Sequence, residues 1–136
     1  MIKITVPGEL PTLNEIIDLA KSHWAKYRES KTLYTELVAW SAFRRPKQDK
    51  VNVIIHWFRA NKRHDKDNIM AGQKYIFDGL KEAGIIGNDG WKHIGDVAHR
   101  FDVDNNNPRV EIELYPADRY DFHYEIIDKQ KVVCMD

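Results

Sequence analysis

Residues 50–58 read KVNVIIHWF, and this stretch decides the fold. It is rich in β-branched and aromatic residues, so it predicts a strand in the centre of a sheet. Three shorter runs alternate between apolar and polar residues and predict further strands, at Ile2–Val6, Val97–Val103 and Val110–Leu114. Only the turn Asp104–Asn107, Pro108 and Arg109 separate the last two, which predicts a hairpin between them.

Apolar residues at helical spacing occupy the two remaining long segments. From Leu13 to about Phe43 the pattern exceeds the usual length of one helix, so we expect two helices with a break near Arg28–Lys31. A further helix is predicted from Asp67 to Ala83, with Gly84 as its C-terminal stop. These elements predict an α+β fold, a mixed β-sheet of four to five strands with packed helices.

The composition is that of one ordinary globular domain. The chain has 136 residues, of which 43% are hydrophobic and 31% charged, and this balance excludes a disordered protein. Its one cysteine, Cys134, excludes a disulfide framework and a cysteine-based zinc cluster. No run approaches the length of a membrane span and the N-terminus has no apolar signal core, so we expect a cytoplasmic protein with no membrane partner.

The formal net charge is zero, but the charges are unevenly distributed along the chain. Between Arg44 and Lys66, eight basic residues stand against two acidic ones. Between Phe101 and Asp136, nine acidic residues stand against four basic ones. This pattern fits either two solvated surfaces of opposite sign or a middle segment that meets a polyanion.

The sequence RHDKDN at residues 63–68 joins the central strand to the following helix. Asp65 and Asp67 are two residues apart, so in extended backbone their carboxylates lie on the same side. Such a pair suits a hard cation such as Mg²⁺, which binds through one or two carboxylates, waters and phosphate oxygens. The alternative is helix capping, because Asp and Asn are good N-cap residues. Capping needs only one of these carboxylates.

Further polar residues follow on the predicted helix. At 100° per residue, Lys74 and Asp78 fall on the same face as Asp67, opposite the apolar residues. This row indicates either a set aimed into a cleft, where Lys74 could stabilise a developing phosphate charge, or a simple surface pair of Lys74 with Asp78. Asp89 lies in the turn sequence Gly-Asn-Asp-Gly, and its position shortly after Gly84 allows it to return toward the helix.

Taken together, these pieces resemble the RusA family of Holliday junction resolvases. The resemblance rests on RHDKDN at 63–68, FDGL at 77–80, KEAG at 81–84 and ND at 88–89, in that order. It covers Arg63 to Asp96 and extends loosely to the opening strand and to Asn107–Glu111. It implies a RusA-like endonuclease domain at residues 1–115.

The resemblance also implies a mechanism. The family consists of homodimeric endonucleases that use Mg²⁺, with Mn²⁺ as a substitute, and resolve four-way DNA junctions by paired symmetric nicks in recombination and repair. Its metal-binding acids correspond to Asp65, Asp67 and Asp89, and its catalytic lysine to Lys74, with Asp78 as a supporting candidate. Lys74 follows Asp67 by seven residues, where the family has one helical turn.

Basic residues of the middle segment are predicted to neutralise the phosphates of branched DNA on either side of the cut. The alternative function is a DNA-junction-binding module without nuclease activity, and a third is a small phosphate-processing enzyme. The extension at residues 116–136 has Tyr120, Phe122 and Tyr124 at period two, which predicts an added strand or a clasp in a dimer. The candidate DNA-binding residues are Arg44, Arg45, Arg59, Lys62, Arg63 and Lys66.

Overall fold

Four strands form one mixed sheet in the order β1-β4-β2-β3. They are β1 (Ile2–Pro7), β2 (Val51–Arg59), β3 (Ile94–Val103) and β4 (Arg109–Pro116). The structure is a computed structural model that describes residues 1–133, so Cys134 lies outside the described residues. The α+β prediction is confirmed, and β2 lies between two neighbouring strands as its composition predicted.

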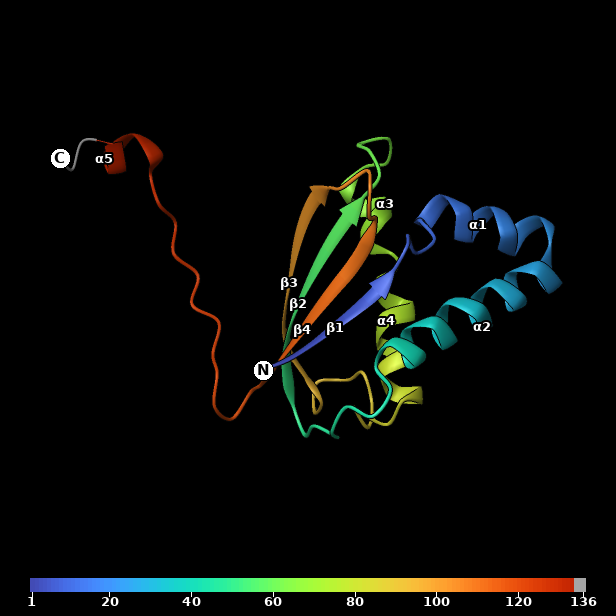
Figure 1. Ribbon diagram of the computed structural model, residues 1–136, viewed down its shortest axis with the longest axis horizontal. Helices are drawn as coiled ribbons and strands as arrows, with labels where there is room; N and C mark the ends of the chain where they lie inside the picture. The colour runs from blue at the N-terminus through green and yellow to red at the C-terminus, as the bar shows by residue number, and fades with distance from the viewer. Residues whose placement is uncertain (134–136) are drawn as a thin grey trace.

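Helices cover one face of the sheet, and the tail of the chain departs on the side of the other face (Figure 1). The helices α1 (Leu13–Ser22) and α2 (Trp24–Ser41) precede β2, whereas α3 (Lys66–Met70) and α4 (Gln73–Glu82) connect β2 to β3. A short helix, α5 (Lys129–Val133), ends the described chain. Within residues 1–133, none of these helices combines the length and the apolar character needed to cross a bilayer.

The predicted hairpin between β3 and β4 is wrong. β3 pairs in parallel with β2, with His56 opposite Arg100, and β4 pairs antiparallel with the other side of β2, with His56 opposite Glu111. β3 is parallel to β2 because α3 and α4 connect the two strands. This helical connection returns the chain to the starting end of the sheet, so the next strand runs in the same direction. The turn after β3 then passes over the end of β2, where Asp104 N donates a hydrogen bond to Arg59 O at 2.8 Å.

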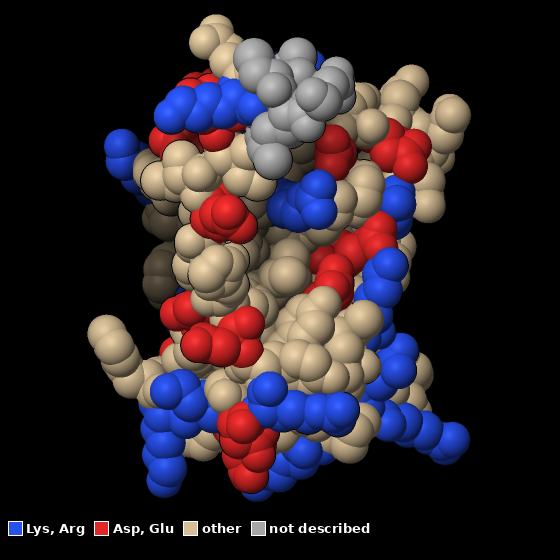
Figure 2. All heavy atoms as spheres, turned by 90° about the vertical axis from the view of Figure 1, so that its left-hand side faces the viewer, with Lys and Arg blue, Asp and Glu red and all other residues tan. Residues whose placement is uncertain are grey.

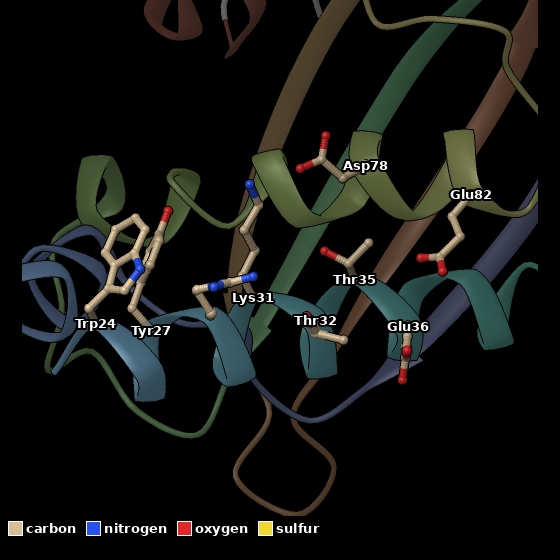
Figure 3. A pocket seen from close by; sticks show the side chains of 9 residues that line it. Trp24, Tyr27, Lys31, Thr32, Thr35, Glu36, Asp78 and Glu82 are labelled. Carbon is tan, nitrogen blue, oxygen red and sulfur yellow. The ribbon is translucent and has the colours of Figure 1, made fainter.

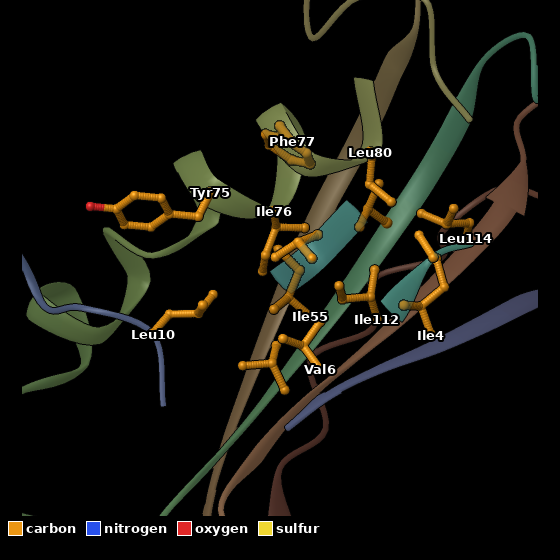
Figure 4. Packing of buried hydrophobic residues seen from close by; sticks show 14 of the residues in the cluster. Ile4, Val6, Leu10, Ile55, Tyr75, Ile76, Phe77, Leu80, Ile112 and Leu114 are labelled. Carbon is orange, nitrogen blue, oxygen red and sulfur yellow. The ribbon is translucent and has the colours of Figure 1, made fainter. Parts of the chain in front are cut away.

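The core lies between the sheet and α4 (Figure 4). Alternate residues of β1, β2 and β4 point into it, because successive side chains of a strand face opposite sides of the sheet. α4 contributes Ile76 and Leu80, both fully buried. Each fully buried side chain of this kind stabilises the fold by roughly 1.5–3 kcal/mol of apolar burial. The fully buried strand residues include Ile4, Val6, Ile55, Trp57, Ile112 and Leu114.

The single helix predicted from Asp67 to Ala83 is two helices, α3 and α4, broken at Ala71 and Gly72. A side chain at Gly72 would come within 3.1 Å of the Trp57 ring and 3.0 Å of Leu10 Cβ, so the bare backbone packs directly on these residues. The predicted stop at Gly84 is confirmed by its φ of 76°, a left-handed conformation that glycine adopts without strain.

The first helical segment contains two helices, as predicted, but the break lies at His23 and not at Arg28–Lys31. His23 has φ −144° and ψ 72°, outside the helical region. Arg28–Lys31 continues α2 because Arg, Glu, Ser and Lys all tolerate a helix interior. α2 then packs on α4 so closely that a Cβ at Gly79 would lie 2.5 Å from Val38 Cβ.

The predicted extra strand in residues 116–136 is not present in the part that the structure describes. The tail is instead tied to the sheet by Asn52, whose Nδ2 donates a hydrogen bond to Tyr120 O at 3.0 Å. Tyr115 packs edge-on against Tyr120 and Phe122. Beyond these contacts the chain leaves the body (Figure 1), so that Ile126 is fully exposed.

The contact between the buried Trp57 and the half-buried His99 makes stability depend on pH. Trp57 Nε1 donates a hydrogen bond to His99 Nδ1 at 3.0 Å, which requires an unprotonated Nδ1. Burial lowers the pKa of the His99 imidazole below its ordinary value of 6.5. The unfolded state therefore binds the proton more readily than the folded state. The contribution of neutral His99 to the free energy of unfolding is complete above about pH 6.5, and it is lost as the pH falls toward the pKa of His99 in the folded protein.

We therefore expect acidification from pH 7.5 to pH 5 to lower the free energy of unfolding less in His99→Gln than in wild type. Glutamine keeps an acceptor for the Trp57 N–H but does not titrate. Urea denaturation at both pH values measures the difference. An identical pH dependence in the two proteins would contradict the assignment to His99.

Candidate functional site

An open cleft of about 860 Å³ lies at the carboxyl ends of β2 and β3. Because these two strands are parallel, both end at the same edge of the sheet, which is where α/β sheets commonly bind ligands. We call it the strand-end cleft. Its lining comes from the end of β2, the loop that follows, α3 and the end of β3, and includes Arg59, Asn61, Lys62, His64, Asp65, Lys66, Asp67, Ile69, Phe101, Asp102 and Val103.

Asp65 and Asp67 are brought together in the strand-end cleft, and both are exposed. Asp65 is the N-cap residue of α3, but its side chain makes no capping hydrogen bond. Asp67 Oδ1 accepts one hydrogen bond, from the N–H of Asn68 at 3.0 Å. The capping role therefore occupies neither carboxylate fully, and both are available to a ligand.

Two carboxylates are enough for Mg²⁺, which keeps several waters and takes further oxygens from a phosphate substrate. A third carboxylate of the cleft, Asp102, lies 2.5 Å from His56 Nε2 and is engaged there. Within residues 1–133, no group of three or more His, Cys, Asp or Glu side chains is arranged to hold a metal by itself. The residues present thus fit a site of two carboxylates, Asp65 and Asp67, that a phosphate would complete.

Asp89 does not line the strand-end cleft. It returns to the side of α4, where it forms a ring of ion pairs with Lys74, Asp78 and Lys81. Both lysine Nζ atoms lie 3.6 Å from Asp89 Oδ2 and 3.3 Å from Asp78 Oδ1. The predicted pairing of Lys74 with Asp78 is present, but Asp67 belongs to the cleft because the helix breaks between them.

The ion-pair ring favours the charged forms of Lys74 and Asp89. Partial burial acts to lower the pKa of the Lys74 ammonium, but attraction to Asp78 and Asp89 outweighs it, and the pKa is raised overall. Desolvation acts to raise the pKa of the Asp89 carboxyl, but the charge of Lys81, a backbone hydrogen bond and the charge of Lys74 lower it overall. The ring therefore fastens the loop after α4 to the helix across the neutral pH range.

The candidate DNA-binding residues fall into two groups, because β2 separates them. Lys62 and Lys66 line the strand-end cleft, and Lys66 Nζ lies 5.5 Å from the centre of the Phe101 ring. Arg59 also lines it, but its guanidinium is buried and pairs with Glu9 at 3.3 Å. Arg63 lies in the same loop, whereas Arg44 and Arg45 precede β2. Nine strand residues at about 3.3 Å each place the two groups roughly 30 Å apart.

A second hollow of about 460 Å³ lies between α2 and α4 (Figure 3). Trp24, Tyr27 and Lys31 line one part of it, and Glu36 and Glu82 line another. Its mixed charge does not favour a polyanion, and its residues are not shared with the strand-end cleft. We therefore assign no ligand to it.

Phe101 and Asp102 line the cleft, although no sequence pattern indicates them as site residues. They reach the cleft only because β3 is parallel to β2 and ends at the same edge. A signal for this parallel pairing was present, since a strand, a helical segment and another strand form the pattern of a crossover unit.

No protein-family model matches this chain, and a search of curated proteins also finds no match.

Proposed function

We propose that the protein is a Mg²⁺-dependent, structure-specific DNA endonuclease that acts in the cytoplasm on four-way junctions. The observation that carries this proposal is the pairing of Asp65 and Asp67 in an open cleft with Lys62 and Lys66 beside them. A cation held by carboxylates next to ammonium groups suits a phosphodiester, because the cation and the ammonium groups together balance its negative charge. The resemblance to the RusA family supports the choice of a branched DNA substrate.

Within this proposal Asp65 and Asp67 would hold Mg²⁺, and the scissile phosphate would supply further oxygens. The chemistry that a bound Mg²⁺ supplies is polarisation of the phosphate and activation of a water near neutral pH. Lys62 and Lys66 would neutralise phosphates on either side of the cut. The Phe101 ring beneath Lys66 favours the position of that ammonium in the cleft.

Paired nicks require two clefts, so the active form would be a homodimer with one cleft in each copy. The test is nicking of a labelled four-way junction and of a linear duplex of the same arm sequence, with Mg²⁺, with Mn²⁺ and with EDTA. We expect metal-dependent nicks in the junction alone. Nicking of neither DNA, by a protein shown to be folded, would overturn the proposal.

A second candidate is a junction-binding module without nuclease activity. It is favoured by the position of Lys74 and Asp89, which the ion-pair ring holds outside the strand-end cleft. This candidate predicts salt-sensitive junction binding with no nicks under any metal condition. The nicking assay combined with a binding titration distinguishes the two.

The contribution of Asp89 to metal binding can be measured directly. Lys74 and Lys81 already neutralise Asp89, so Asp89→Asn should weaken Mn²⁺ binding only slightly. We expect the loss of Mn²⁺ affinity in Asp67→Asn to be at least about ten times larger than the loss in Asp89→Asn. Isothermal titration with Mn²⁺, in the presence of an uncleavable phosphorothioate DNA, gives both affinities. Equal losses in the two variants would place Asp89 among the metal ligands, as the family resemblance implies.

A further inference from the structure

The end of the sheet opposite the strand-end cleft carries two loops, the one between α2 and β2 and the one between α4 and β3 (Figure 1). Hydrogen bonds hold these loops together. Gln48 N donates to Ile85 O at 2.7 Å, and Val51 N donates to His93 O at 3.0 Å. The two loops therefore form one continuous surface at this end of the molecule.

Trp91 lies in the second of these loops and is 94% exposed. Two backbone hydrogen bonds close its loop, because Gly90 O accepts from His93 N and Ile94 N at 3.0 and 2.9 Å. The ion-pair ring holds Asp89, two residues before Trp91, against α4. A large indole presented to solvent by a loop that hydrogen bonds and ion pairs hold to the body is typical of a contact surface.

Basic side chains surround this end. Arg44, Lys47 and Lys50 come from the first loop and Lys92 from the second, and all four are exposed. Figure 2 shows Lys and Arg side chains gathered along this lower end of the molecule, with acidic side chains among them, and Asp49 is the exposed acidic residue of the first loop. We call the surface made by Trp91 and these four residues the basic end. An exposed aromatic ring among ammonium and guanidinium groups fits nucleic acid, because the ring stacks on a base while the cations meet phosphates.

We propose that the basic end is a second DNA-binding surface, in which Trp91 stacks on an unstacked base of branched DNA. This inference rests on the proposed function, because it takes the same substrate. The surface lies roughly 30 Å from the strand-end cleft, about nine base pairs along a duplex, so both surfaces can engage one junction at once. A paired base inside a duplex does not expose its face, so Trp91 would favour branched over linear DNA.

The test is the affinity of the full chain for a fluorescein-labelled four-way junction and for a linear duplex, measured by anisotropy in EDTA so that no cleavage occurs. We expect Trp91→Ala to weaken junction binding about 5- to 100-fold and duplex binding much less. Trp91→Phe should restore most of the affinity, because phenylalanine also stacks. The matched control is Trp24→Ala, since Trp24 is 62% exposed but lies at the start of α2, outside the basic end.

Charge variants test the same surface independently. We expect the double variant Lys47→Glu and Lys50→Glu to reduce the slope of junction affinity against salt, whereas Trp91→Ala leaves the slope unchanged. Equal junction affinities for wild type, Trp91→Ala and Trp24→Ala would overturn the inference while leaving the nuclease proposal intact. Loss of self-association in Trp91→Ala, with DNA affinity unchanged, would also overturn it by assigning the surface to protein contacts. Absence of DNA binding in wild type would overturn both.

Discussion

Asp67→Asn should lose at least about 100-fold in the rate of Mg²⁺-dependent junction nicking while it still binds the junction. The amide removes a negative charge from the two-carboxylate set in the strand-end cleft, and the remaining carboxylate of Asp65 holds a cation less tightly. The lysines beside the cleft are unchanged, so contacts with phosphates remain. Single-turnover nicking and anisotropy titration, run on the same junction, measure the two properties separately.

The matched control for this variant is Asp118→Asn. Asp118 is also exposed, but it lies in the turn after β4, at the other end of the sheet from the cleft. We expect it to nick at the wild-type rate. Equal activity of Asp67→Asn and Asp118→Asn would show that the paired carboxylates of the cleft take no part in the reaction.

Gly79→Ala should lower the free energy of unfolding by about 1–3 kcal/mol, although alanine favours a helix over glycine by up to about 1 kcal/mol. The added Cβ would lie 2.5 Å from Val38 Cβ and 2.9 Å from the backbone oxygen of Thr35. Neither atom is the end of a flexible side chain, so α2 and α4 must move apart. Because the cost of this movement exceeds the gain in helix propensity, Gly79→Ala lowers the free energy of unfolding. Urea denaturation monitored by tryptophan fluorescence measures it.

Gly90→Ala provides the comparison, because a Cβ at Gly90 would meet no atom within 4 Å. Gly90 also lacks the positive φ that makes alanine strained elsewhere. We expect its stability to stay within about 0.5 kcal/mol of wild type. Equal stability of both glycine variants would mean that α2 and α4 can move apart at Gly79 without a loss of stability.

The sequence predicts the elements of this fold better than their partners. The composition of β2 identifies a central strand, and the alternation in β1 and β4 identifies which side chains face the core. Alternation does not say which strand lies next to which, and so β3 was predicted as a partner of β4. The break at Gly72 lies where the backbone packs on the Trp57 ring, which is distant in sequence, and helical periodicity carries no information about that contact.

The same distinction applies to the candidate site. Asp65 and Asp67 are predictable as a pair because they are neighbours in the chain, and the structure brings them into one cleft. The place of the Asp89 side chain in the fold depends on the conformation of its loop and on the lysines of α4. Its distance along the sequence from Asp67 therefore does not predict whether it reaches the cleft. Asp102 can be predicted as a cleft residue only if the parallel pairing of β3 with β2 is known.

The position of β1 has a consequence for how the chain reaches its folded state. In the described residues β1 pairs only with β4, so that Ile4 faces Ile112 across more than a hundred residues of intervening sequence. Contacts so distant in sequence close a long loop and slow the folding reaction. During synthesis β1 emerges before β4 and has no hydrogen-bonding partner until residues 109–116 have left the ribosome. The sheet is therefore completed only once β4 is available, and a chain shortened before Arg109 would leave β1 without its partner.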